Sequence, residues 1–116
     1  MKLLFKGPVI ITGGSSQLGM ALARALREEG AKTLSVCRSS EGGEAGLSCL
    51  PLDEPESLPE RCRGLLGEPP AHLVDLMHSR FESLIAGAAP EAIMEWAAVD
   101  IGLRARLVRA VGRSML

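Results

Sequence analysis

A glycine- and serine-rich segment near the N-terminus has the residue types that bind a phosphate group. It reads Thr12-Gly13-Gly14-Ser15-Ser16-Gln17-Leu18-Gly19, between a short apolar run and a stretch of helical periodicity. Gly13 permits a tight turn, and Gly19 lets the following helix pack closely on a sheet. Ser15 and Ser16 add hydroxyl donors, and the unpaired backbone N–H groups at a helix start can hold a pyrophosphate. The segment therefore predicts a dinucleotide site, and a glycine turn without a ligand is the alternative.

The elements that must position this segment are a strand before it and a helix after it. Pro8–Ile11 is a continuous apolar run, typical of a strand buried on both faces of a parallel sheet, and Pro8 is tolerated at its first position. From Leu18 to Glu29 apolar residues recur at helical spacing, and Gly30 supplies the stop. The side chains that this helix is predicted to turn inward are Leu18, Leu22, Ala25 and Leu26.

Further strands and a short helix follow in alternation. The other predicted strands are Thr33–Cys37, Leu47–Leu52 and His72–Met77. The loop Ser39–Gly46 is polar and rich in glycine, so the crossover helix expected there is missing or reduced to a turn. A short helix is predicted over Glu56–Leu66, with the inward side chains Leu58, Cys62, Leu65 and Leu66.

A long helix ends the chain. It is predicted from Pro90 to about Ser114, after a helical turn near Phe81–Ile85. Pro90 suits a first helical turn, and Glu91 is favoured there by the helix dipole. The order of elements predicts an α/β fold: a partial doubly wound parallel sheet of Rossmann type, with about four strands, flanking helices and a long C-terminal helix. Residues 1–116 would form one such domain. The predicted apolar stripe of the last helix is Trp96, Leu103, Leu107, Ala110 and Val111.

Composition and charge narrow the range of partners. The chain has 13 Lys and Arg residues against 14 Asp and Glu residues, so no basic groove for nucleic acid is expected. No apolar stretch is long enough to span a bilayer, so no membrane partner is expected. Cys37, Cys49 and Cys62 are odd in number and fit no zinc spacing. They predict reduced thiols in a cytoplasmic protein without a metal site.

The glycine segment resembles that of the short-chain dehydrogenase/reductase family. The common form in that family is Thr-Gly-x-x-x-Gly-x-Gly, directly after the first strand. Gln17 stands where this form has its middle glycine, and it adds a side chain where the family brings backbone close to the cofactor. The resemblance implies that the cofactor site includes the six residues Gly13, Ser15, Ser16, Gln17, Leu18 and Gly19.

Residues after the later strands extend the resemblance and imply which dinucleotide is bound. Arg38 follows the second strand, where this family selects its cofactor, and an arginine there can pair with a 2′-phosphate. Arg38, with its neighbour Ser39, therefore favours NADP(H) over NAD(H). The alternative is that Arg38 is simply solvated. Asp53 resembles the family's Asp near the adenine ring, or it is a simple loop cap. Met77 is expected on the nicotinamide side of the pocket.

The residues that perform the family's redox chemistry have no counterpart in this chain. The catalytic Ser and the Tyr-x-x-x-Lys motif lie on later elements of the family, and this chain contains no tyrosine. The family's Asn-Asn-Ala-Gly falls on Asp75-Leu76-Met77-His78, with none retained. His72 and His78 have no nucleophile and carboxylate arranged around them, so no catalytic residue is assigned.

Two functions remain open. In the first, the chain is the NADP(H)-binding portion of a short-chain dehydrogenase/reductase-type oxidoreductase, whose complete form transfers hydride to a carbonyl substrate. In the second, it is a non-catalytic nucleotide-binding or interaction subunit that pairs with a related chain.

Exposed apolar surface predicts association in either case. The strand near Leu73, Val74 and Leu76 lacks an outer neighbour, and the apolar stripe of the final helix exceeds what a half-sheet covers. We therefore expect a homo-oligomer or a related partner chain at the helix and the sheet edge, and no isolated monomer. The closing arginines are expected to be solvated, since cations are favoured near a helix C-terminus: Arg104, Arg106, Arg109 and Arg113.

Overall fold

The described part of the chain forms a parallel sheet with helices on both faces. The computed structural model describes residues 6–37, 49–51, 54–77 and 87–116. In these ranges the sheet has the order β3-β2-β1-β4, and all its pairings are parallel. Its strands are β1 (Val9–Thr12), β2 (Thr33–Cys37), β3 (Cys49–Pro51) and β4 (His72–Asp75). The predicted helical turn at Phe81–Ile85 lies outside the described residues.

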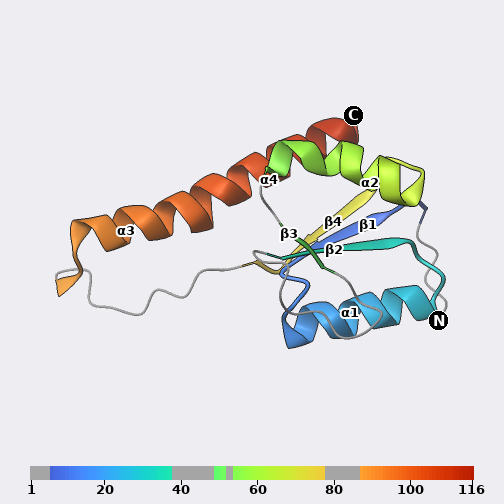
Figure 1. Cartoon of the computed structure of the whole chain (residues 1–116), viewed down its shortest axis with the longest axis horizontal. Helices are drawn as coiled ribbons and strands as arrows, with labels where there is room; N and C mark the ends of the chain where they lie inside the picture. Colours follow the sequence, from blue (N-terminus) through green and yellow to red (C-terminus); the bar gives the residue numbers. More distant parts are fainter. Residues whose placement is uncertain (1–5, 38–48, 52–53, 78–86) are drawn as a thin grey trace.

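The helices form two layers around this sheet (Figure 1). One face is covered by α1, and the other by α2 and the end of the long C-terminal helix. The predicted α/β fold with a doubly wound sheet and a long final helix is confirmed. The helical elements are α1 (Gln17–Glu28), the 3-10 turn η1 (Pro55–Ser57), α2 (Leu58–Leu66), α3 (Pro90–Ala97), the π-helical segment η3 (Ala98–Leu103) and α4 (Arg104–Ser114).

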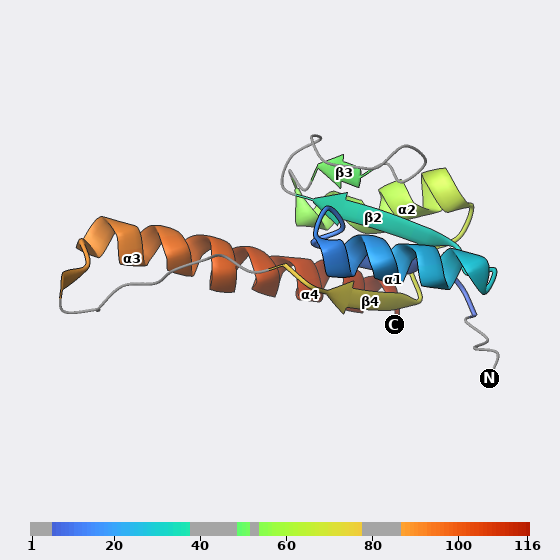
Figure 2. The same cartoon turned by 90° about the horizontal axis from the view of Figure 1, so that it is seen from below.

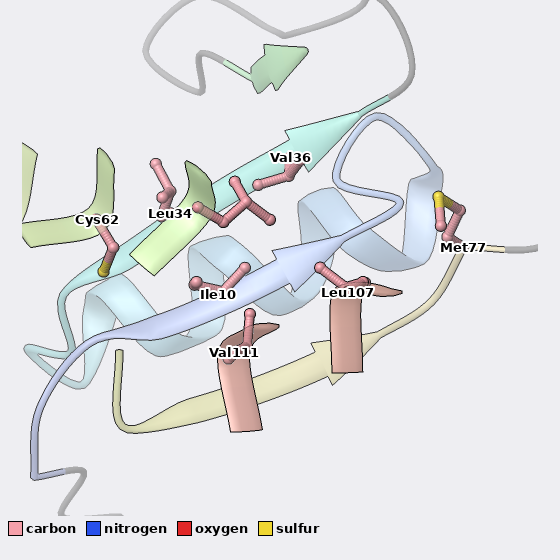
Figure 3. Close-up of a cluster of buried hydrophobic side chains, with 8 residues drawn as sticks. Ile10, Leu34, Val36, Cys62, Met77, Leu107 and Val111 are labelled. Atoms are coloured by element: carbon pink, nitrogen blue, oxygen red, sulfur yellow. The ribbon is translucent and has the colours of Figure 1, made fainter. Parts of the chain in front are cut away.

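Alternation along β1 divides the core into two clusters. Ile10 points toward α2 and α4, and Val9 and Ile11 point toward Ala23 and Leu26 of α1. Because β1 is covered on both faces, all four of its residues are buried. Figure 3 shows the cluster on the α2 and α4 side, whose buried members are Ile10, Leu34, Val36, Leu58, Cys62, Met77, Leu107 and Val111.

The inward faces of the two short helices differ from those predicted. Leu18 is 65% exposed, and the buried residues of α1 are Gly19, Ala23 and Leu26. The close approach of Gly19 to the glycine loop sets this orientation and turns Leu18 outward. Leu65 is 59% exposed, because the last turn of α2 packs against the core through the following residue, Leu66. Ala25, also predicted inward, is exposed.

The inner face of the final helix is covered more fully than the sequence predicted. Leu107 and Val111 are fully buried against the sheet, and Leu103 packs beside them. The expectation that this stripe stays available to a partner is therefore wrong for Leu107 and Val111. Figure 2 shows the reason: α4 lies along the sheet, whereas α3 and the segment that joins it to α4 extend beyond the sheet.

An exposed ion pair fixes α4 to the segment before α2. Arg106 donates two hydrogen bonds to the carboxylate oxygens of Glu56, each at 2.7 Å. This hydrogen bonding holds the pKa of Glu56 below its usual range. Arg106 is thus solvent-exposed, as expected, but it has a partner on another element.

Candidate functional site

The glycine loop lies at the carboxyl ends of three strands. Gly13 has φ +70°, and a Cβ there would lie 2.9 Å from the carbonyl carbon and oxygen of Leu76, just after β4. Only glycine tolerates both this conformation and this contact. On the other side, the N–H of Gly14 donates to the carbonyl of Val36 in β2 at 3.0 Å. The loop is therefore tied to both neighbours of β1.

The first turn of α1 packs directly on this loop. A Cβ at Gly19 would lie 2.3 Å from the carbonyl oxygen of Gly13 and 2.9 Å from the Cα of Gly14. The close packing predicted for Gly19 is present, but its contact is the backbone of the loop instead of a strand. This contact fixes where the helix start lies relative to the ends of the strands.

Ser16 is the N-cap of α1. Its hydroxyl accepts from the N–H of Gly19 at 3.0 Å and donates to the carbonyl of Gly13 at 2.8 Å. Ser16 therefore shapes the loop, whereas Ser15 keeps an exposed side chain. The N–H groups of Gln17 and Leu18 have no hydrogen-bond acceptor among the described residues. These two donors, at the positive end of a 12-residue helix, are suited to an anion.

The remaining predicted site residues fall into two groups. Arg38, Ser39 and Asp53 lie outside the described residues. Met77 is 6% exposed and belongs to the buried core cluster, at whose margin Figure 3 shows it. A contact between Met77 and a cofactor stays a prediction.

Asp75 is the residue at this edge that sequence reasoning missed. Its Oδ1 accepts from the Thr12 hydroxyl at 2.6 Å and from the Met77 N–H at 3.1 Å. Its Oδ2 accepts from Nε of Arg104 at 2.6 Å. Arg104 also lies 3.5 Å from Asp100, one helical turn earlier. The carboxylate therefore joins β1, β4 and the long helix beside the glycine loop.

The expectation of solvated arginines is wrong for Arg104, whose side chain is 33% exposed and ion-paired. The signal for this network was present in the sequence. Thr12 and Asp75 end two neighbouring parallel strands, and they are register partners. Only the packing of α4 on the sheet brings Arg104 to them.

No family model and no curated protein sequence matches the chain. Its fold is nevertheless similar to that of several solved structures. Ligand-free aldohexose dehydrogenase from Thermoplasma acidophilum superposes with a TM-score of 0.79 at 19% identity, over 95% of this chain and 44% of its own. A short-chain type dehydrogenase/reductase from Mycobacterium marinum gives 0.78 at 18% identity, over 94% and 50%. The chain has the fold of part of a short-chain dehydrogenase/reductase.

A third structure shares this short-chain dehydrogenase/reductase fold. WbmG from Bordetella bronchiseptica, solved in complex with NAD and UDP, gives a TM-score of 0.63 at 22% identity, over 91% of this chain and 34% of its own. The chain thus spans half or less of the length of these three proteins. At these identities the similarity concerns the fold.

In this short-chain dehydrogenase/reductase fold, the outer edge of β4 borders an apolar groove. The N–H groups of His72 and Leu76 donate toward β1, so alternation turns those of Leu73 and Asp75 outward. No other strand among the described residues pairs with this edge. The groove measures about 530 Å³ and lies toward the amino ends of β1 and β4. Its walls come from α1, β4 and α4 and include Leu22, Leu26, Leu73, Val74, Val108 and Met115.

The described residues offer neither a membrane span nor a metal cluster. No helix in those ranges combines the length and apolar character needed to cross a bilayer. No group of three or more His, Cys, Asp or Glu side chains there could hold a metal ion. Cys37 and Cys62 are both buried, and burial raises the pKa of the Cys62 thiol.

Proposed function

We propose that the chain binds a nicotinamide dinucleotide at the carboxyl edge of the sheet, as the cofactor-binding portion of a short-chain dehydrogenase/reductase-type oxidoreductase. The pair of unpaired N–H groups at Gln17 and Leu18, held against the glycine loop, carries this proposal. They give a pyrophosphate two backbone donors at the positive end of a helix dipole. NAD in the WbmG structure supports a dinucleotide on this fold.

The neighbouring residues have separate roles in this proposal. Ser15 supplies an exposed hydroxyl to the phosphates, and Ser16 holds the loop through its cap. Gln17 departs from the family pattern, yet its side chain is exposed and so does not fill the loop. Gly13 and Gly19 keep the loop backbone close to the strands and to α1. Asp53 would lie near the adenine ring.

NADP(H) is the preferred dinucleotide in this proposal, because of Arg38. Val36, two residues before Arg38 in the sequence, accepts a hydrogen bond from the glycine loop. The end of β2, which precedes Arg38 and Ser39 in the sequence, thus lies beside the proposed pyrophosphate site. A guanidinium there would pair with the 2′-phosphate that distinguishes NADP(H).

Replacing Arg38 with Asp should erase or reverse the preference for NADP(H). A charge-assisted contact contributes on the order of 1.5–3 kcal/mol, which is about tenfold or more in affinity. Calorimetric titration with NADPH and with NADH measures the ratio of the two dissociation constants. Arg63→Asp, an equal change of charge at an exposed position on α2, is the control and should leave the ratio unchanged. Tighter binding of NADH by the unmodified chain would contradict the role of Arg38.

The hydride chemistry belongs to the bound cofactor and to residues of a complete oxidoreductase. This chain's own residues bind and orient the dinucleotide. Reduction of a carbonyl also needs a positioned acid to protonate the developing alkoxide, and the family's tyrosine has no counterpart here.

The purified 116-residue chain should therefore catalyse no NADPH-dependent carbonyl reduction. Oxidation of NADPH, followed by absorbance with a panel of carbonyl substrates, measures this. A matched preparation of Gly19→Ala, whose affinity for the cofactor should be at least about tenfold lower, reports any contaminating reductase. Turnover above that background would show that another acid replaces the tyrosine.

The alternative function is a non-catalytic interaction subunit that pairs with a related chain. The apolar groove beside the unpaired edge of β4 favours it, because natural sheet edges are usually protected by charges, prolines or bulges. We further propose that residues 1–116 form one domain and, from its odd number of cysteines, that it lies in the cytoplasm. Failure to bind either dinucleotide, with the fold intact, would favour the interaction subunit.

A further inference from the structure

A series of contacts connects the long helix to the glycine loop and starts at Arg104. This arginine is the first residue of α4, the part of the long helix that lies along the sheet in Figure 2. Its Nε donates to Oδ2 of Asp75 at 2.6 Å, and its Nη1 lies 3.5 Å from Oδ2 of Asp100. Although the arginine side chain is 33% exposed, two carboxylates therefore fix its direction.

Asp75 extends these contacts to the backbone beside the loop. Its Oδ1 accepts from the Thr12 hydroxyl at 2.6 Å and from the Met77 N–H at 3.1 Å. A Cβ at Gly13 would lie 2.9 Å from the carbonyl group of Leu76 and 3.2 Å from the backbone nitrogen of Met77. The last two residues thus form a wall on which the glycine loop packs. If the carboxylate moves, this wall loses one of its hydrogen bonds.

We propose that Arg104 is a positioning residue of the dinucleotide site. It does not contact the dinucleotide, but through Asp75 it holds the wall on which Gly13 packs. Since α1 begins against the same loop, Arg104 also sets where the N–H groups of Gln17 and Leu18 lie. The packing of the long helix and the affinity for the dinucleotide are therefore coupled. This inference rests on the proposed function, because it concerns the same site.

The apolar contacts of α4 do not replace this link. Leu107 and Val111 pack in the core cluster, and apolar burial holds the helix to the sheet without requiring a particular direction. A hydrogen bond between charged groups does require alignment. In the described part of the chain, no other side chain of α4 donates a hydrogen bond to β1 or β4. Loss of Arg104 should therefore loosen the end of β4 even in a folded chain.

Arg104→Met tests the coupling by calorimetric titration with NADPH. The dissociation constant should rise about fivefold or more, because the loop loses a support that binding must then restore. Val111→Ala is the control for stability: it removes buried methyl groups from the same helix and lowers the melting temperature, but should leave the constant unchanged. Arg113→Met, the same change at an exposed position of α4, is the control for charge. Equal effects of Arg104→Met and Val111→Ala on the constant would overturn the proposal.

Two further variants test whether Arg104 acts through Asp75. Arg104→Lys keeps a positive donor for this carboxylate, so its dissociation constant should lie between those of the unmodified chain and Arg104→Met. Thr12→Val removes the hydroxyl that donates to the same carboxylate. Combined with Arg104→Met, it should raise the constant by less than the product of the two separate effects. Fully multiplicative effects, or no rescue by lysine, would overturn the route through Asp75.

Amide hydrogen exchange in the free chain tests the same route without a ligand. The N–H of Gly14 donates to the Val36 carbonyl, and that of Met77 donates to Asp75. Both should exchange about fivefold faster in Arg104→Met than in Val111→Ala. Equal exchange in the two variants would overturn the proposal. If the unmodified chain binds no NADPH, the proposed function fails, whereas this readout still decides whether Arg104 positions the loop.

Discussion

Replacing Gly19 with alanine should abolish most dinucleotide binding and destabilise the fold by about 1–3 kcal/mol. The added Cβ would lie 2.3 Å from the Gly13 carbonyl oxygen, and backbone cannot yield as a flexible side chain can. Alanine's higher helix propensity returns at most about 1 kcal/mol, so the clash dominates. Because the start of α1 must move away from the loop, the N–H groups of Gln17 and Leu18 lose their positions. Affinity should fall at least about tenfold.

Gly64→Ala provides the matched control for this experiment. Gly64 lies inside α2, and a Cβ there meets no atom within 4 Å. The same substitution should therefore stabilise the fold by roughly 0.5–1 kcal/mol and leave binding unchanged. Denaturant unfolding and calorimetric titration measure the two quantities. If Gly19→Ala behaves like Gly64→Ala, the loop is not the rigid phosphate site that we propose.

Replacing Asp75 with alanine should destabilise the fold by about 2–3 kcal/mol, or roughly 10 °C in melting temperature. The change removes the acceptor of the Thr12 hydroxyl, the Met77 N–H and Arg104 Nε at once. It also leaves the guanidinium of Arg104, whose side chain is 33% exposed, without its closest carboxylate. Partial exposure keeps the loss below that of a fully buried ion pair.

Arg106→Met tests whether burial sets the size of this effect. Arg106 forms a two-pronged ion pair with Glu56 from the same helix, but the side chains of both residues are about half exposed. Its loss should barely change the melting temperature, because water and salt screen exposed pairs. Asp75→Asn keeps one acceptor oxygen, so its shift in melting temperature should lie between those of Asp75→Ala and Arg106→Met. Equal shifts for Asp75→Ala and Arg106→Met would show that the Asp75 network does not hold the long helix to the sheet.

Local sequence patterns determined the elements and the position of the glycine loop. Thr33–Cys37 was predicted with its observed bounds, and the long helix begins at Pro90 as predicted. These features are readable because they depend on neighbouring residues: a run of buried side chains makes a strand, and a proline is tolerated only in the first helical turn. The fold class followed from the order of these elements.

Tertiary structure alone decided which faces of the helices are buried and which polar groups meet. Helical periodicity allowed Leu18 and Leu65 to point inward, yet packing at Gly19 and Leu66 turned both outward. The same periodicity could not say that Leu107 would be fully covered. The hydrogen bond between Thr12 and Asp75 alone joins residues 63 positions apart, and the partners in this network come together only when β1, β4 and α4 pack. Periodicity fixes which residues share a face of a helix, but the rotation of that helix against its neighbours depends on contacts between distant segments.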